Sequence, residues 1–165
     1  MKSLFIIRHA KSSWGQPSLD DFDRPLNERG KKDAAEMAKR LEEKKINIEL
    51  FVSSPAKRAR KTAGQFMEAF NRDKDEILLI PGLYHASPDT FTNVISGLED
   101  KYSSVALFSH NPGITAFINT LTYVRLDNMP TCGIFGISLD AGHWKEFPTA
   151  KKDFLFFDFP KSGAE

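Results

Sequence analysis

Leu4-Phe5-Ile6-Ile7-Arg8-His9-Ala10 is the stretch of sequence that decides the fold. Its four consecutive large apolar residues predict a strand that is buried on both faces, which is typical of a central strand in a parallel sheet. In open α/β sheets, ligands bind just beyond the carboxyl ends of such strands. Arg8 and His9 lie at that place. Because an isolated Arg-His pair more often only ends a strand at the surface, the rest of the chain must supply the evidence for a site.

Composition limits the classes of protein to which this chain can belong. With 165 residues, 41% of them hydrophobic and 27% charged, it is predicted to form one globular domain over residues 1–165. A formal net charge of +1 gives no overall field for binding nucleic acid or an anionic membrane. The single cysteine, Cys132, excludes an internal disulfide and a multi-cysteine zinc site. No apolar stretch has the length of a signal peptide or a membrane span, so we expect a cytoplasmic protein.

Strand and helix patterns alternate along the chain. Apolar runs predict further strands over 48–53, 77–80, 105–108, 133–139 and 153–159, the last of them at an edge of the sheet. Helical spacing of apolar residues predicts helices over 28–45, 55–70, 88–98 and 112–122. Strands separated by helices imply right-handed βαβ crossovers, so the predicted fold class is α/β.

Several residues mark where the predicted helices begin. Asn27 is a suitable N-cap, and Ser54-Pro55 reads as a cap followed by proline at the first helical position. Asn111-Pro112-Gly113 repeats that pattern. Gly30 lowers helix propensity inside a first turn, which suggests that another backbone approaches there.

Polar residues follow three of the predicted strands, at Arg8-His9, at Ser54 to Arg58 and at Ser109-His110. If these strands are parallel, their ends meet at one edge of the sheet, and two arginines and two histidines converge there. Lys57, Arg60 and Lys61 crowd the start of the second predicted helix, where cations oppose the helix dipole, and we expect them to reach solvent. Arg58 instead can point over the sheet edge toward an anion.

Phosphate is the anion that best fits two planar guanidinium groups. A neutral imidazole can attack phosphorus and hold the phosphoryl group covalently, and nearby arginines lower its pKa in favour of that neutral form. A backbone carbonyl would fix its tautomer, and a second, cationic histidine could neutralise the phosphate oxygens. The four histidines form no HxH or HExxH pair, and the chain contains neither a P-loop nor a GxSxG elbow. We therefore expect neither a metal nor a cofactor.

These motifs resemble those of the histidine phosphatase superfamily. Arg8-His9-Ala10 is similar to its Arg-His-Gly signature, 54–63 (SPAKRARKTA) to its Ser-Pro-x-x-Arg-Ala-x-x-Thr-Ala motif, and Ser109-His110 to its third motif. The runs RHAKSSW and DFDRPLNERG most resemble the SixA-type phosphohistidine phosphatase branch. The resemblance implies a phosphoglycerate mutase-like, three-layer α/β/α sandwich with a mostly parallel sheet. It also implies that His9 is the nucleophile and that Arg8, Arg58 and His110 complete the catalytic phosphate pocket.

One departure from the family pattern bears on the substrate. Members that act on phosphate esters supply a Glu or Asp general acid after the second motif, whereas residues 82–89 contain no glutamate. The candidates for that role are His85, Asp89 and the loop residues Asp20, Asp21 and Asp23. A missing acid suits phosphohistidine, because the P–N bond is weak and the departing imidazole is readily protonated.

We therefore predict a metal-independent phosphatase that acts on phosphohistidine in a partner protein through a phospho-His9 intermediate. One alternative is a small-molecule phosphomonoesterase of the same superfamily that acts on a phosphorylated metabolite. The other is a catalytically inactive module that binds phosphate or a phosphopeptide, although a pure binder would not need the nucleophile.

Overall fold

The computed structural model of the protein describes residues 1–161. Its six strands form one sheet in the order β3-β2-β4-β1-β5-β6. The strands are β1 (Lys2–Arg8), β2 (Leu50–Ser53), β3 (Leu78–Leu79), β4 (Ser104–Ser109), β5 (Ile134–Leu139) and β6 (Lys152–Asp158). The first four strands are parallel, whereas β5 is antiparallel to β1 and β6 is antiparallel to β5. The sheet is mostly parallel, as the sequence predicts.

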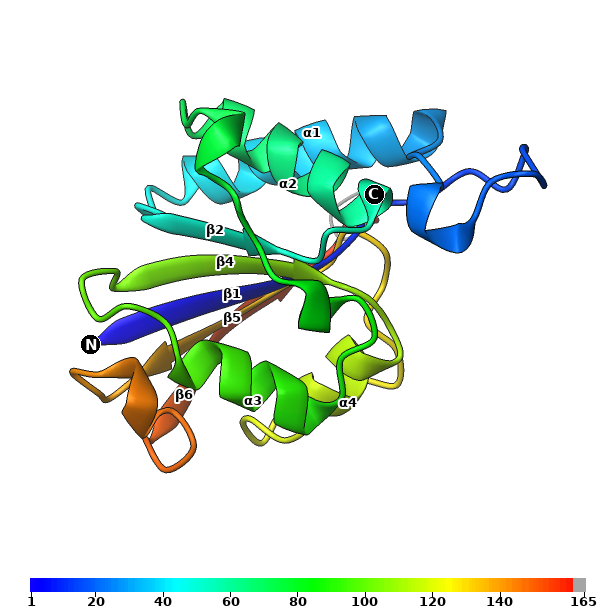
Figure 1. Ribbon diagram of the computed structural model, residues 1–165. Coiled ribbons are helices and arrows are strands. Elements are labelled where there is room, and N and C mark those ends of the chain that lie inside the picture. The colour runs from blue at the N-terminus through cyan, green and yellow to red at the C-terminus, as the bar shows by residue number, and fades with distance from the viewer. Residues whose placement is uncertain (162–165) are drawn as a thin grey trace.

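Helices cover both faces of the sheet. On one face lie α1 (Glu28–Glu43) and α2 (Lys57–Ala69), and on the other lie α3 (Pro88–Ser96) and α4 (Gly113–Ile118) (Figure 1). Four short 3-10 turns complete the described elements, namely η1 (Asp21–Asp23), η2 (Lys74–Glu76), η3 (Pro81–Leu83) and η4 (Trp144–Glu146). The three layers confirm the predicted α/β/α sandwich.

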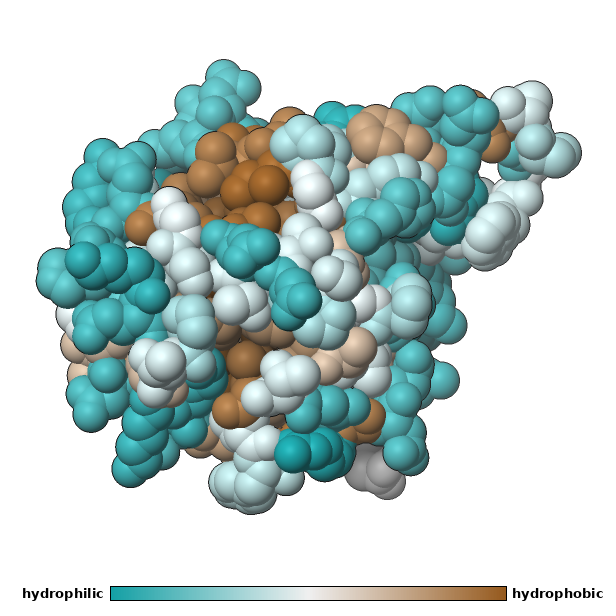
Figure 2. Space-filling model, turned by 60° about the horizontal axis from the view of Figure 1, so that its bottom comes forward, coloured by the Kyte–Doolittle hydropathy of each residue, from teal (hydrophilic) through white to brown (hydrophobic). Residues whose placement is uncertain are grey.

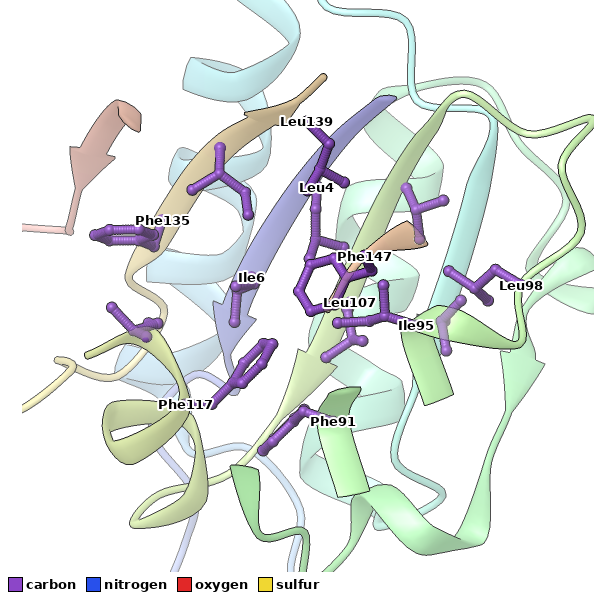
Figure 3. Packing of buried hydrophobic residues seen from close by; sticks show 14 of the residues in the cluster. Leu4, Ile6, Phe91, Ile95, Leu98, Leu107, Phe117, Phe135, Leu139 and Phe147 are labelled. Carbon is purple, nitrogen blue, oxygen red and sulfur yellow. The ribbon is translucent and has the colours of Figure 1, made fainter. Parts of the chain in front are cut away.

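The central strand β1 supplies side chains to two cores. Leu4 and Ile6 pack in the layer of α3 and α4, where Figure 3 shows Leu4 near Leu139 and Ile6 near Phe117. Phe5 and Ile7 point to the opposite face and pack in the layer of α1 and α2. The four apolar residues of this strand are thus buried on both faces of the sheet, as predicted. The strand ends at Arg8, directly after them.

The start of α1 is fixed to the loop that follows β1. The side chain of Asn27 accepts a hydrogen bond from the Gly30 N–H at 2.7 Å, which confirms the predicted cap. A Cβ atom at Gly30 would lie 2.0 Å from the carbonyl oxygen of Lys11. The close backbone approach expected at this glycine is therefore present.

Two predicted helix starts are wrong in detail. The first residue of α2 is Lys57 and its N-cap is Ala56, because the Ser54 hydroxyl instead accepts from the Ala56 N–H and contacts His110. Helix α4 has Pro112 as its N-cap and ends at Ile118, four residues before the predicted end. The Asn111 side chain instead accepts from the Thr115 N–H at 3.2 Å.

The face of the molecule drawn in Figure 2 is mostly hydrophilic. Figure 2 shows one face on which hydrophobic patches, drawn in brown, are surrounded by hydrophilic side chains in teal. None of the helices within residues 1–161 is long and apolar enough to cross a membrane.

Candidate active site

The ends of β1, β2 and β4 lie side by side. Arg8 pairs with Ser109 across β1 and β4, and Ser53 pairs with Phe108 across β2 and β4. A pocket of about 660 Å³ opens at this edge. The residues that line it include all four that the sequence predicts to meet there, Arg8, His9, Arg58 and His110.

Backbone contacts orient the His9 ring. Its Nδ1 atom lies 2.7 Å from the carbonyl oxygen of Ala10 and donates to it, so Nε2 is left without a proton in the neutral ring. Burial, followed by the charges of Arg58 and Arg8, lowers the pKa of His9 to about 4. At neutral pH, His9 is therefore an uncharged imidazole with a free lone pair on Nε2.

Both predicted arginines contribute to the pocket wall. Arg8 donates from Nη1 to the carbonyl oxygen of Met129 at 2.8 Å. Arg58 donates from Nη1 to the backbone oxygen of Asp21 at 2.7 Å, and its Nη2 lies 3.0 Å from Oδ2 of the same residue. The Nε atoms of both arginines are buried and have no hydrogen-bond partner in the described part of the chain.

His110 lies beside His9, with 5.1 Å between the ring centroids. Its Nε2 is 2.7 Å from the Ser54 hydroxyl, whereas its Nδ1 is buried and has no partner within residues 1–161. Burial, with smaller contributions from neighbouring His9 and Arg58, lowers the pKa of His110 to about 3. The pocket therefore favours the neutral form of His110 and not the cationic form expected from the sequence, because burial penalises the charge.

Among residues 1–161, Asp21 is the one carboxylate that lines the pocket. It accepts a hydrogen bond from the Tyr84 hydroxyl at 2.6 Å and lies 3.0 Å from the Arg24 guanidinium, in addition to its contacts with Arg58. Burial raises the pKa of Asp21, but the hydrogen bonds from Tyr84, Arg24 and Arg58 outweigh burial and hold the pKa well below its ordinary range. This carboxylate is ionised at neutral pH and has no proton to donate.

The segment between β1 and α1, drawn in blue, extends past the sheet edge and carries η1 (Figure 1). The sequence predicts Asp21 only as one of three loop acids, and it does not predict Arg24 and Tyr84 as pocket residues. Arg24 had a local signal in the DFDRPLN run, whereas Tyr84 reaches Asp21 across 63 positions of sequence. Asp20 and Asp23 do not line the pocket.

The two other candidate acids occupy different environments. His85 is exposed at the pocket, where its ring lies on that of Tyr84 with 4.0 Å between centroids. Asp89 is exposed in the first turn of α3 and does not line the pocket. The fold thus brings His85, but not Asp89, to the four central residues.

A hydrogen-bonded threonine joins the His9 loop to α2. The Ala10 N–H donates to the Thr62 hydroxyl at 2.9 Å, and that hydroxyl donates to the Arg58 carbonyl at 2.8 Å. On the other side of the loop, the Cys132 N–H donates to the carbonyl oxygens of both Arg8 and His9. The backbone around the histidine is held from two directions.

No group of three or more His, Cys, Asp or Glu side chains among residues 1–161 is arranged to hold a metal ion.

Comparisons with known proteins agree with these motifs. The family model of the histidine phosphatase superfamily, branch 1, matches residues 4–84. An uncharacterized protein of Mycobacterium leprae is 31% identical over 168 positions, which cover 94% of this chain and 100% of that protein. The chain belongs to the histidine phosphatase superfamily. The matched segment contains Arg8, His9 and Arg58, whereas His110 follows it.

Solved structures place the chain with the SixA-type histidine phosphatases. The crystal structure of SixA from Agrobacterium tumefaciens is 27% identical and has a TM-score of 0.79, over 95% of this chain and 97% of that chain. The tungstate complex of the protein histidine phosphatase SixA shares the fold with a TM-score of 0.80 at 23% identity, over 96% and 97% of the two chains. The predicted fold and the predicted enzyme class, a phosphatase, are confirmed.

Proposed function

We propose that this histidine phosphatase hydrolyses phosphohistidine in a partner protein, without a metal ion and through a phosphoryl group held on His9. The observation that carries the proposal is the state of the His9 ring. A neutral imidazole, with Nδ1 bound to the Ala10 carbonyl, keeps the Nε2 lone pair for attack on phosphorus.

In the first step, Nε2 of His9 attacks the phosphorus atom and forms a new P–N bond. The P–N bond to the substrate imidazole breaks, its electron pair stays on the departing nitrogen, and that nitrogen takes a proton from water. In the second step, water attacks phospho-His9, inorganic phosphate leaves and Nε2 regains its lone pair. Arg8, Arg58 and His110 would stabilise the charge on the phosphoryl oxygens in both steps.

Buried side-chain nitrogens without a partner support the assignment of these three residues. The Nε atoms of Arg8 and Arg58 and the Nδ1 atom of His110 are three of the five side-chain atoms within residues 1–161 that are buried without a partner. An unpaired buried donor costs ~1–3 kcal/mol, so it is seldom retained without a role. A bound phosphoryl group would supply acceptors at this place and would favour protonation of His110.

The preference for phosphohistidine rests on Asp21. A placed acid typically accelerates departure of a basic alkoxide by ~10²–10⁴. In the described part of the chain, the only carboxylate that lines the pocket is Asp21, which is ionised and bound to Arg58, Arg24 and Tyr84, so it is unsuited to that role. An imidazole leaving group needs less help.

The decisive experiment measures phosphate release, with chelator present, from a phosphohistidine peptide, a phosphoserine peptide and a panel of sugar phosphates. We expect release chiefly from phosphohistidine, its loss in His9→Ala, and radioactive phosphate trapped on His9 when the wild type is quenched. His143→Ala is the matched control, because His143 is exposed and pairs with Asp100 outside the pocket.

Other results would identify the alternatives. Faster turnover of a phosphate ester, lost in His85→Ala, would indicate the small-molecule phosphomonoesterase. Phosphate binding without release from any substrate would indicate the inactive binding module.

A further inference from the structure

A second cavity of about 560 Å³ lies beside the phosphate pocket, on the layer formed by α1 and α2. We call it the α2 groove. The residues that line it are Pro25, Leu26, Lys31, Lys57, Arg60, Lys61, Gly64, Gln65, Met67, Lys74, Ile77 and Leu79. None of the residues placed in the phosphate pocket belongs to this set.

The rim of the α2 groove is strongly cationic. Of the described residues that line it, five are Lys or Arg and none is acidic, although the whole chain has a net charge of only +1. Lys57, Lys61 and Lys74 have no ion pair within the described residues, whereas Lys31 pairs with Glu28 at 3.5 Å. Such a concentration of unpaired charge creates a local field that attracts anions.

Three of these cationic side chains lie at the N-terminal end of α2, where the helix dipole is unfavourable for positive charge. Lys57, Arg60 and Lys61 lie in the first two turns of α2, at the positive end of its dipole. Within residues 1–161, Arg60 alone of the three has a hydrogen-bond acceptor, since its Nε donates to the Pro55 carbonyl at 2.7 Å. A local conflict of this kind, without an internal partner, is expected at a binding surface.

The floor of the α2 groove is apolar. Leu26 and Met67 are buried, Ile77 is half-buried and Leu79 is 40% exposed. Gly64 leaves room in the floor, since the nearest atoms to a Cβ there belong to the flexible Lys74 side chain at 3.6 Å. No aromatic side chain lines the cavity, so it lacks the stacking platform that single-stranded nucleic acids use.

The α2 groove adjoins the phosphate pocket along two segments. Pro25 and Leu26 directly follow Arg24, and Lys57 directly precedes Arg58. Gly64 lies six residues beyond Arg58, which is about 9 Å along the helix axis. A ligand that extends from the phosphate pocket would therefore enter the α2 groove within two helical turns.

We infer that the α2 groove docks an acidic, amphipathic segment of the phosphorylated partner protein. This inference rests on the proposed function. Protein–protein interfaces of standard size bury about 800 Å² on each partner, much more than a phosphoryl group provides. Acidic residues of the segment would pair with Lys57, Lys61 and Lys74. Its apolar residues would pack on the exposed parts of Ile77 and Leu79, above the buried Leu26 and Met67.

The test uses two synthetic peptides that carry one phosphohistidine and a 15-residue extension. The extension of one peptide contains Glu and Leu at helical spacing, and the other has Gln in place of Glu. Phosphate release gives kcat and KM, and fluorescence anisotropy gives the affinity of the unphosphorylated acidic peptide. The variant Lys61→Glu/Lys74→Glu is compared with Lys32→Glu/Lys39→Glu, which makes the same charge change on α1 outside the α2 groove.

We expect the wild type to prefer the acidic peptide through a lower KM. Lys61→Glu/Lys74→Glu should raise that KM about tenfold, because each exposed ion pair contributes only a few-fold to binding. The control variant, the Gln peptide and kcat should change less than twofold. Gly64→Leu, which fills the floor without altering charge, should weaken anisotropy binding of the acidic peptide.

Three outcomes would overturn the inference. Equal affinity of both peptides for the wild type, or equal effects of the two double variants, would exclude docking in the α2 groove. Tighter binding of a single-stranded oligonucleotide than of the acidic peptide would assign the groove to nucleic acid. Since anisotropy needs no catalysis, peptide binding without phosphate release would overturn the proposed function and leave the docking surface intact.

Discussion

At the scale of single residues, the two pocket histidines make stability depend on pH. Burial is the chief cause that lowers the pKa of His9 to about 4 and of His110 to about 3, from an ordinary value of 6.5. Protons therefore bind the unfolded chain more readily, and the stability that the neutral rings retain is complete above about pH 6.5 and lost as pH falls toward 4 and 3. In that pH range, each histidine makes the free energy of unfolding change by up to ~1.4 kcal/mol per pH unit.

Urea unfolding between pH 4.5 and 7.5 measures this slope. The variant His110→Gln lacks the contribution of one histidine to this pH dependence. We therefore expect its free energy of unfolding to fall less steeply, as pH is lowered, than that of the wild type. His143→Gln, at the exposed pair with Asp100, should keep the wild-type slope. An identical slope in His110→Gln and the wild type would mean that His110 is not held neutral by burial.

The hydroxyl of Thr62 couples the backbone that follows His9 to the backbone of Arg58. Thr62→Val keeps the shape but leaves the Ala10 N–H without an acceptor, which should cost ~1–3 kcal/mol of stability. Because His9 then loses its anchor, kcat should also fall, whereas Thr62→Ser should retain both properties. Thermal unfolding and phosphate release check the two effects. A loss of stability with unchanged kcat would show that this hydroxyl does not position His9.

At the level of secondary structure elements, the start of α1 requires a glycine, Gly30, because the Lys11 backbone packs against it. Gly30→Ala would place Cβ 2.0 Å from the Lys11 carbonyl oxygen, so α1 and the loop after β1 must separate. We expect a loss of at least ~1–3 kcal/mol, as for other overpacked sites, and weaker phosphate binding because the same loop continues to Asp21. Gly64→Ala is the control in α2, where a Cβ has room and should stabilise the helix by ~0.5–1 kcal/mol. Comparable destabilisation by both changes in urea unfolding would contradict this account.

Elements with local signals were predictable from sequence, and those that depend on distant contacts were not. Apolar runs and the Asn27 cap indicated β1 and the start of α1 because they act within a few residues. The start of α2 was misassigned because Ser54 binds His110, 56 positions away. For the site, the convergence of strand ends followed from parallel topology alone. The bridge from Asp21 to Tyr84 depends on how a long loop folds back, which no local pattern specifies.

At the scale of the whole molecule, neighbouring residues of one strand stabilise different layers. Ile6 belongs to the core under α3 and α4, and Ile7 to the core under α1 and α2. Both side chains are fully buried, and both belong to the same strand, so disruption of one core displaces residues of the other. We therefore expect the chain to unfold as a single cooperative unit, in agreement with the single domain predicted from its length.

Ile6→Val and Ile7→Val test this cooperativity, since each should cost ~0.5–1.5 kcal/mol. Urea unfolding is followed by far-UV circular dichroism and by fluorescence of Trp144, which is buried in the core that contains Ile6. Trp14 is exposed on the loop, and a Trp14→Phe background removes its emission. In a cooperative molecule, Ile7→Val moves the Trp144 transition as far as the dichroism transition, although Ile7 and Trp144 lie on opposite faces of the sheet. If Ile7→Val shifted the dichroism transition and left that of Trp144 in place, the layer that carries α1 and α2 would unfold on its own.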